Sequence, residues 1–203
     1  MILPRSFYAR PTLTVARDLL GKVLVHRSPD GVTSGKIVEV EGYVGEDDPA
    51  CHAAPGPTPR NQPLYGEPGH AYVYFNYGVH DMFNVVTEPP GKPAAILARA
   101  LEPIEGIELM EARRAARRVA RRPHIRMEHL CRGPGNLARA MGITRTDNRQ
   151  DLCGRTLFIE DRGLQVGEVA WSPRIGINVG VERTWRCYVV GSRAVSGRRS
   201  AKK

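Results

Sequence analysis

The sequence predicts a single domain of the α+β class. Its 203 residues suit one domain, and hydrophobic residues make up 41% of them, which is enough for a sizeable core. The 16 prolines and 21 glycines indicate many turns and therefore short elements. Segments with the two-residue period of strands and segments with the composition of helices both occur along the chain. We expect these short strands and helices to share one core over residues 1–196.

The first elements are a helix and a strand. Residues 12–20 predict a short helix that begins with a threonine cap and ends at Gly21. An apolar strand over residues 22–26 follows, and residues 28–31 have the composition of a turn. The order helix, strand, turn leads directly into the segment with the most informative pattern.

That segment is a strand over residues 36–43, in which apolar and polar side chains alternate. The alternation places Glu39, Glu41 and Tyr43 on one face. The ordinary interpretation of two carboxylates on one face is a polar side exposed to water. The alternative is that one of them has a chemical task, because the strand runs into a long irregular loop.

The irregular loop covers residues 45–69 and is followed by a predicted hairpin. The loop holds six prolines and shows no periodicity, and structureless segments of this length inside a domain are often functional. Residues 70–77 and 82–87 predict two strands joined around Gly78. The loop and the hairpin together are the first candidates for a binding site.

Aromatic residues dominate the hairpin. Tyr77 precedes Gly78 at the tip, where a ring has little to pack against, and an exposed aromatic on a basic protein can wedge between base pairs. If Tyr77 lies opposite Asp81, then Tyr74 lies opposite Asn84. A ring and an amide would then project together, one to stack on a flat heterocycle and one to test its substituents.

The second half of the chain adds further short elements. Residues 94–101 predict a strand that ends at Glu102-Pro103, and residues 104–122 predict a helix. Six arginines between 113 and 122 form either a solvated face or a surface that contacts DNA. A short helix begins at Gly133-Pro134-Gly135 and ends near Gly142, and residues 157–190 are strand-like and basic.

The charge of the chain favours a polyanionic partner. Lys and Arg number 30 against 21 Asp and Glu, so the net charge is +9. A basic domain of this size suggests nucleic acid, although an arginine-rich composition alone gives the same sign. Residues 197–203 carry four of the positive charges and are expected to be a flexible tail.

Several function classes are not supported by the sequence. No run of about 18 apolar residues predicts a membrane span, and residues 1–8 lack the apolar core of a secretion signal. The four cysteines form no Cys-x-x-Cys pair, so we expect neither a zinc site nor any other metal or cofactor. We expect a reduced protein in the cytoplasm of a prokaryote, associated with its nucleoid, or in the nucleus of a eukaryote.

Several of these segments together resemble the alkyladenine DNA glycosylase family, also called 3-methyladenine DNA glycosylases of the mammalian type. The resemblance runs in family order from about residue 5 to residue 196. It rests on the motifs Glu39-Val-Glu-Gly-Tyr43, Cys51-His52, Thr58-Pro-Arg-Asn61, Tyr72-Val-Tyr-Phe-Asn-Tyr-Gly78, Asn84 and Arg99-Ala-Leu-Glu-Pro103. The family fold implied is one domain with a curved, mainly antiparallel sheet, flanking helices and a protruding β-hairpin.

The resemblance implies a monomeric, monofunctional enzyme of base excision repair. Such an enzyme flips an alkylated or deaminated purine out of double-stranded DNA and hydrolyses its N-glycosidic bond, which leaves an abasic site. The implied substrates are 3-methyladenine, 7-methylguanine, hypoxanthine and ethenoadenine. Glu41 matches the general base that activates water, while Arg99 and the backbone of Ile175 match groups that hold this water.

The same resemblance assigns the base pocket and the DNA contacts. Tyr43, His52 and Tyr74 match the walls that stack on and hydrogen-bond the flipped base, and Asn84 matches the residue that screens against normal guanine. Tyr77 matches the wedge that intercalates into DNA, and Arg60 and Asn61 match DNA-binding positions. Next to the wedge the chain departs from the family pattern, because Val79 and His80 replace bulkier residues. Glu39 keeps the ordinary interpretation of a polar outer face.

Two other functions compete with this hypothesis. The family fold resembles a tRNA-contacting domain of formyltransferases, so a non-catalytic nucleic-acid module is one alternative. It gives no reason for Glu41, Arg99 and Tyr77 to coincide. A small-molecule nucleoside hydrolase is the other alternative, and it requires neither a wedge nor a net charge of +9.

Overall fold

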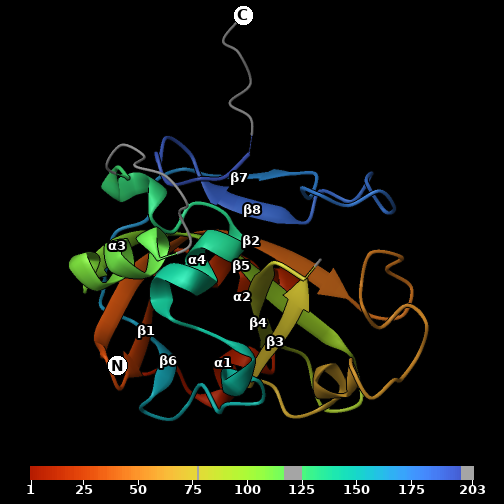
Figure 1. Ribbon diagram of the computed structural model, residues 1–203. Helices are drawn as coiled ribbons and strands as arrows, with labels where there is room; N and C mark the ends of the chain where they lie inside the picture. Colours follow the sequence, from red (N-terminus) through yellow and green to blue (C-terminus); the bar gives the residue numbers. More distant parts are fainter. Residues whose placement is uncertain (77, 117–124, 198–203) are drawn as a thin grey trace, which may run out of the picture.

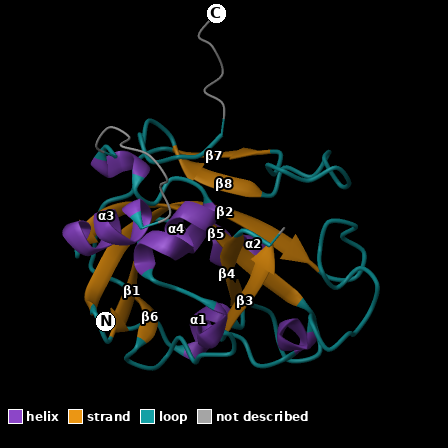
Figure 2. Ribbon diagram, viewed as in Figure 1, coloured by secondary structure: helices purple, strands orange, loops and turns teal. Residues whose placement is uncertain are grey.

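One curved sheet, antiparallel throughout, runs through the molecule, and helices pack against it (Figures 1 and 2). The computed structural model describes residues 1–76, 78–116 and 125–197. The strands of this described part lie in the order β3-β4-β5-β2-β1-β6, while β8 pairs with both β2 and β7. They are β1 (Val23–Ser28), β2 (Gly31–Val44), β3 (Ala71–Asn76), β4 (His80–Val86), β5 (Ala94–Glu105), β6 (Leu157–Glu160), β7 (Val169–Ser172) and β8 (Arg186–Val189).

The helices are short, as the composition predicts. α4 packs on β4 and β5, α2 packs on β2, and α3 packs on α4. Side chains from these helices and from the sheet form one large apolar core. The α-helices are α1 (Arg5–Tyr8), α2 (Thr12–Leu19), α3 (Ile107–Ala115) and α4 (Pro134–Met141), and the 3-10 helices are η1 (Gln62–Tyr65), η2 (Met127–His129) and η3 (Arg145–Asp147). The predicted α+β class and the curved antiparallel sheet are confirmed.

β2 is the strand on which the site depends, and the ordinary interpretation of its two carboxylates as a polar face exposed to water is wrong. Glu39 and Glu41 are both 0% exposed. The register between β2 and β5 shifts on either side of Glu39, so the strand is irregular at this point. β8 pairs with β2 along its edge at Glu39, Val40 and Glu41, and Ser196 covers the carboxylate of Glu39 through its backbone N–H and its hydroxyl.

The start of α2 and the end of β5 are among the element boundaries that differ from the prediction. No side chain of α2 caps its start; instead the carboxylate of Glu88 accepts hydrogen bonds from the backbone and the hydroxyl of Thr12 at 2.6 and 2.9 Å. β5 continues to Glu105, beyond its predicted end, and Gly106 at φ 74° turns the chain into α3. Most of the arginine-rich half of the predicted helix lies outside the described residues.

The hairpin of β3 and β4 is present with a pairing two residues away from the predicted one. Tyr72 lies opposite Asn84, and Tyr74 lies opposite Met82. The turn is centred on Gly78, which takes a left-handed φ of 66°, whereas the predicted pairing of Tyr77 with Asp81 would centre it on Val79. A shift of two residues keeps side chains on their predicted face, so Tyr74 and Asn84 still share one face as diagonal neighbours. Tyr77, the predicted wedge, lies outside the described residues.

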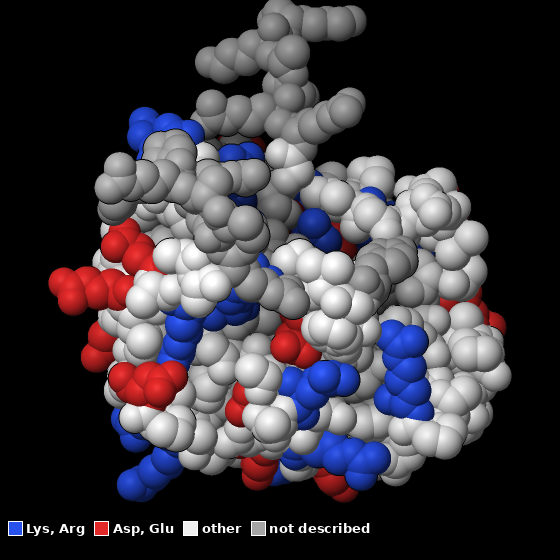
Figure 3. Space-filling view, viewed as in Figure 1, with Lys and Arg blue, Asp and Glu red and all other residues white. Residues whose placement is uncertain are grey.

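The surface carries charge of both signs. On the face shown in Figure 3, acidic side chains gather at the left, over α3, while Lys and Arg side chains extend across the centre and the lower right. No helix in the described ranges is long and apolar enough to cross a membrane. The predicted basic tail is described only at Gly197.

Candidate active site

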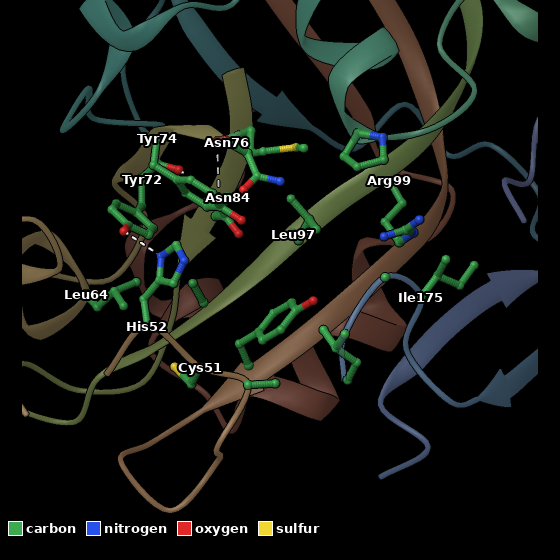
Figure 4. Close-up of a pocket in the computed structure, with 17 residues that line it drawn as sticks. Cys51, His52, Leu64, Tyr72, Tyr74, Asn76, Asn84, Leu97, Arg99 and Ile175 are labelled. Atoms are coloured by element: carbon green, nitrogen blue, oxygen red, sulfur yellow. Dashed lines mark hydrogen bonds between the residues drawn. The ribbon is translucent and has the colours of Figure 1, made fainter. Parts of the chain in front are cut away.

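A cavity of about 360 Å³ opens between the hairpin, β2, β5 and the loop that follows β7. This volume lies within the range of small-molecule sites. In Figure 4 the rings of His52, Tyr72 and Tyr74 stand at one end of the cavity, and Arg99 and Ile175 stand at the other. The lining residues are Tyr43, Ala50, Cys51, His52, Leu64, Tyr72, Tyr74, Asn76, Met82, Asn84, Ala95, Leu97, Arg99, Pro134, Ile175, Gly176 and Ile177.

Glu41 lies behind the wall of this cavity and accepts three hydrogen bonds. Its Oε2 accepts from Arg99 Nη1 at 3.1 Å and from the Tyr43 hydroxyl at 2.9 Å. Its Oε1 accepts from the backbone N–H of Ile175 at 2.7 Å. All three donors line the cavity, whereas the carboxylate itself is 0% exposed. The fold therefore brings together Glu41, Arg99 and Ile175, the three residues predicted to handle the water.

Tyr43 connects the carboxylate to the aromatic part of the cavity. Burial, together with the neighbouring charge of Glu41, raises the pKa of Tyr43 far above its usual value, so the hydroxyl stays protonated and donates. The guanidinium of Arg174 lies 4.6 Å from the centre of the Tyr43 ring. Arg174 is in turn fixed by two bonds to the buried carboxylate of Asp48, at 2.6 and 2.8 Å. The ring of Tyr43 is therefore held in one orientation.

The opposite wall is built from histidine and tyrosine rings. His52 Nδ1 lies 2.8 Å from the Tyr72 hydroxyl, and the His52 ring centre lies 4.4 Å from that of Tyr74 (Figure 4). Burial, with a smaller contribution from the nearby charge of Arg60, lowers the pKa of His52 to about 4. His52 is therefore neutral at pH 7, with one ring nitrogen able to donate and the other able to accept.

Asn84 presents one polar atom to the cavity between these walls. Its side-chain nitrogen donates to the backbone carbonyls of Tyr72 at 3.0 Å and Met82 at 3.3 Å. The hairpin thereby fixes the amide, and the carbonyl oxygen Oδ1 remains as the group that can meet a bound ring. Asn84 shares its predicted face with Tyr74, although the two residues are diagonal neighbours and not the predicted direct pair.

A family model described as methylpurine-DNA glycosylase matches residues 6–193 of the chain. The chain belongs to this family. It is therefore an enzyme of the DNA glycosylase type, a hydrolase that acts on N-glycosyl bonds. Because the match covers nearly the whole chain, it favours the enzyme over a non-catalytic nucleic-acid module.

Proteins from distant organisms are similar to this glycosylase over their full lengths. A protein of Methanocella arvoryzae is 49% identical over 202 residues, which cover 97% of this chain and 96% of the relative. A protein of Chlorobium phaeobacteroides is 46% identical over 98% of both chains, and one of Clostridium acetobutylicum is 46% identical over 97% and 98%. The names of all three provisionally assign them as 3-methyladenine DNA glycosylases.

The two predicted DNA contacts of this glycosylase have different surroundings. Arg60 is exposed at the rim, with its guanidinium 5.6 Å from the centre of the Tyr74 ring. Asn61 is 1% exposed, and its side-chain nitrogen donates to the backbone carbonyls of His52 and Gly56 at 2.7 and 2.8 Å. Asn61 therefore shapes the loop that carries His52, and its side chain is not available to DNA in this structure.

Tyr72 is a pocket residue of the glycosylase to which the sequence reasoning gave no role. Burial raises the pKa of Tyr72 to about 12, so its hydroxyl is protonated and can share its hydrogen bond with His52. The signal was present in the sequence, because the two-residue period of β3 places Tyr72, Tyr74 and Asn76 on one face.

Glu39 does not line the cavity, and its predicted place on an outer face is wrong, because its side chain is fully buried. Its Oε1 accepts from Arg186 Nε at 2.7 Å, from the Ser196 hydroxyl at 2.9 Å and from Arg99 Nε at 3.2 Å. Its Oε2 accepts from the backbone N–H of Ser196 at 2.6 Å.

Across residues 1–76, 78–116 and 125–197, no group of three or more His, Cys, Asp or Glu side chains could hold a metal ion.

Proposed function

We propose that this glycosylase removes alkylated or deaminated purines from double-stranded DNA, with Glu41 as the general base that activates the hydrolytic water. One observation carries the proposal. A buried carboxylate, held by Arg99, Tyr43 and the Ile175 backbone, stands directly behind an aromatic cavity of about 360 Å³. The proposed lesions are 3-methyladenine, 7-methylguanine, hypoxanthine and ethenoadenine.

The aromatic walls suit a flipped purine. A base inside a duplex is out of reach of any side chain, so the enzyme must rotate it out of the stack, at a cost of about a few kcal/mol. The rings of Tyr43 and Tyr74 offer π faces, which attract the cationic rings of 3-methyladenine and 7-methylguanine. Neutral His52 can exchange a hydrogen bond with the edge of a neutral lesion, and Asn84, whose side-chain nitrogen is held by the hairpin, would test the substituents of the base.

The proposed reaction is a single displacement. The C1′–N bond of the nucleotide breaks and its electron pair leaves with the purine, while the oxygen of water bonds to C1′ and the water proton passes to Glu41. The negative charge of Glu41 also stabilises the positive charge that develops on the sugar. Catalysis by a positioned base contributes roughly 10²–10⁴-fold. No lysine is among the described residues that line the cavity, which supports hydrolysis to an abasic site without a Schiff base.

Access of water to Glu41 requires a local rearrangement. The Tyr43 hydroxyl occupies Oε2 in the unbound protein. When a base stacks on the Tyr43 ring, the hydroxyl turns from Oε2 to the incoming water, and Glu41 then accepts the water proton in its place. Arg60 would hold a phosphate at the rim, and Tyr77 would fill the gap that the flipped base leaves in the duplex, with the enzyme acting as a monomer.

The test is excision from methylated duplex DNA. The purified protein should release 3-methyladenine without added metal, and Glu41→Gln should excise at least about 100-fold more slowly while it still binds a duplex with a stable abasic-site analogue. Glu46→Gln is the matched control, because Glu46 also accepts a tyrosine hydroxyl, that of Tyr65, but at the surface. Glu41→Gln excising at the wild-type rate, or a covalent adduct trapped by borohydride, would contradict the mechanism.

A further inference from the structure

Four charged side chains form one buried group, in which Arg99 lines the cavity and the other three lie behind it. Glu39 and Glu41 are 0% exposed, and Arg99 and Arg186 are 6% and 8% exposed. Two carboxylates and two guanidiniums make the group neutral. Charges at this depth are tolerated only when they are paired and hydrogen-bonded, so the loss of one member changes the contacts of the other three.

Arg99 is shared unequally within this group. Its Nη1 donates to Glu41 at 3.1 Å, while its Nε donates to Glu39 at 3.2 Å. Its Nε and Nη2 also donate to the Ser196 hydroxyl, at 3.3 and 3.2 Å. A guanidinium can bind one carboxylate through two parallel bonds. Here Glu39 and Ser196 engage the remaining nitrogens, so Arg99 meets Glu41 through one nitrogen.

The hydroxyl of Ser196 uses all of its hydrogen-bonding positions within this group. Its hydroxyl has one proton, which goes to Glu39 at 2.9 Å, and two acceptor positions, which take the two nitrogens of Arg99. Its backbone N–H donates to Glu39 at 2.6 Å. Ser196 is 157 residues away from Glu39 along the chain, and only its fold position brings it to the catalytic group.

Two arginines hold the backbone of the segment that carries Ser196. Arg186 Nη2 donates to the Ser196 carbonyl at 2.9 Å. Arg132 donates to the carbonyl of Val195 at 3.0 Å and to that of Gly197 at 3.4 Å. Each of the three backbone carbonyls from 195 to 197 therefore accepts a hydrogen bond from a guanidinium, and these bonds fix the segment beside Glu39.

We propose that Glu39 and Ser196 are positioning residues of the reaction, a proposal that rests on the proposed function of Glu41. They hold the guanidinium of Arg99 in single contact with Glu41, which leaves the carboxylate able to take a proton from water. Without them, Arg99 swings into a two-bond pair with Glu41, and the carboxylate becomes a weaker proton acceptor. The segment from 195 to 197 is thereby part of the active site.

The first measurement is single-turnover excision set against binding of an abasic-site analogue in DNA. Ser196→Ala removes only the hydroxyl and should slow excision about 3–10-fold, while Glu39→Gln should slow it at least about 10-fold. Both variants should bind the analogue within about threefold of the wild type. Glu102→Gln is the control, because Glu102 also accepts a serine hydroxyl and pairs with a cation, Lys36, away from the cavity.

The second measurement is a double-mutant cycle with Arg99→Lys. If Glu39 acts through Arg99, the combination of Glu39→Gln and Arg99→Lys excises no more slowly than Arg99→Lys alone. If the two losses multiply instead, Glu39 does not act through Arg99, and that result overturns the proposal. If Glu39→Gln does not fold, the cycle of Ser196→Ala with Arg99→Lys decides by the same criterion.

The outcome separates this proposal from the one on which it rests. A wild-type protein without excision, or Glu41→Gln at the full rate, overturns the proposed function. A wild type that excises, with Glu41→Gln inactive and Ser196→Ala at the wild-type rate, overturns only the positioning roles. Slow excision by Ser196→Ala with unchanged DNA binding and no further loss in the double variant supports them.

Discussion

Glu39 and Glu41 stand two residues apart on β2, are equally buried and contact the same arginine, yet their surroundings differ in kind. Besides Arg99, the partners of Glu39 are Arg186 and Ser196, neither of which lines the cavity. The three donors to Glu41 all line it. Residue type and burial therefore do not separate the two carboxylates; what separates them is whether their partners can respond to a ligand.

This difference decides which of the two carboxylates can change its hydrogen bonds when a ligand binds. Arg186 and Ser196 lie away from the cavity, so their hydrogen bonds to Glu39 can stay in place when a ligand enters. A carboxylate held by the wall of a cavity keeps the same satisfied hydrogen bonds in the free protein but can exchange one of them when a ligand enters. In the free protein the proposed base, Glu41, is therefore covered by its hydrogen-bond donors. Arg99 connects the surroundings of Glu41 with those of Glu39.

Arg99→Ala should give the largest effect, because it removes the connection. The two carboxylates would remain buried without a shared cation, and breaking a buried charged group costs about 3–5 kcal/mol of unfolding free energy. Excision should fall at least about 100-fold. Urea denaturation and single-turnover excision measure the two losses. A variant as stable as the wild type would contradict the view that these charges depend on one another.

The comparison also marks how far sequence reasoning reaches. Alternation along β2 placed Glu41 and Tyr43 on one face, and local signals placed α4 between Pro134 and Gly142 correctly. Alternation could not reveal that Glu39 is covered, because Arg186 and Ser196 arrive from about 150 residues further along the chain. Local patterns fix the side on which a residue lies, whereas tertiary contacts decide what lies opposite it.

The hairpin teaches the same lesson on a smaller scale. The sequence placed Tyr74 and Asn84 on one face, and this is confirmed, but their direct pairing was wrong by two residues. The period of a strand survives such a shift, while the pairing depends on the turn geometry at Gly78, where φ is 66°. The residues proposed to handle the water and the rings proposed to stack on the base could be named from resemblance, whereas the hydrogen bonds between them could be found only in the fold.

Tyr43→Phe should give the next largest effect, because it frees Oε2 of Glu41 without removing the ring. The variant lacks the hydroxyl that is proposed to turn to the incoming water, so we expect excision to slow about 3–10-fold, while the ring still binds the flipped base. Tyr65→Phe, which removes the hydroxyl bound to exposed Glu46, should leave excision unchanged. An unchanged rate in Tyr43→Phe would show that the cover on Glu41 has no part in the reaction.

His52 predicts a pH effect on stability that belongs to the aromatic wall and not to the charged group. Burial, helped by Arg60, lowers the pKa of His52 to about 4 from the 6.5 of an unfolded histidine. The unfolded chain therefore binds more protons between these values, and stability should fall as the pH drops from about 6.5 to 4. Melting temperatures measured across this window should fall less in His52→Gln; parallel curves would contradict the burial of a neutral imidazole.

Glu102→Gln should give the smallest effect, and it sharpens the comparison most cleanly. Like Glu39, Glu102 accepts a serine hydroxyl, from Ser192 at 2.7 Å, and pairs with a cation, Lys36 at 2.6 Å. Burial raises its pKa, but these two hydrogen bonds outweigh burial and hold the pKa below its usual value.

The side chain of Glu102 is 37% exposed, so water screens the pair and replaces the lost bonds. We expect a loss below about 1 kcal/mol in urea denaturation at pH 7, where the carboxylate is charged, and a vanishing difference as the pH falls below its pKa. If Glu102→Gln lost as much unfolding free energy as Glu39→Gln, the hydrogen-bond partners of a carboxylate would determine its contribution and its burial would not. A much smaller loss in Glu102→Gln would instead attribute the larger loss in Glu39→Gln to burial. Burial is also the reason why the charges of Glu39, Glu41, Arg99 and Arg186 depend on one another.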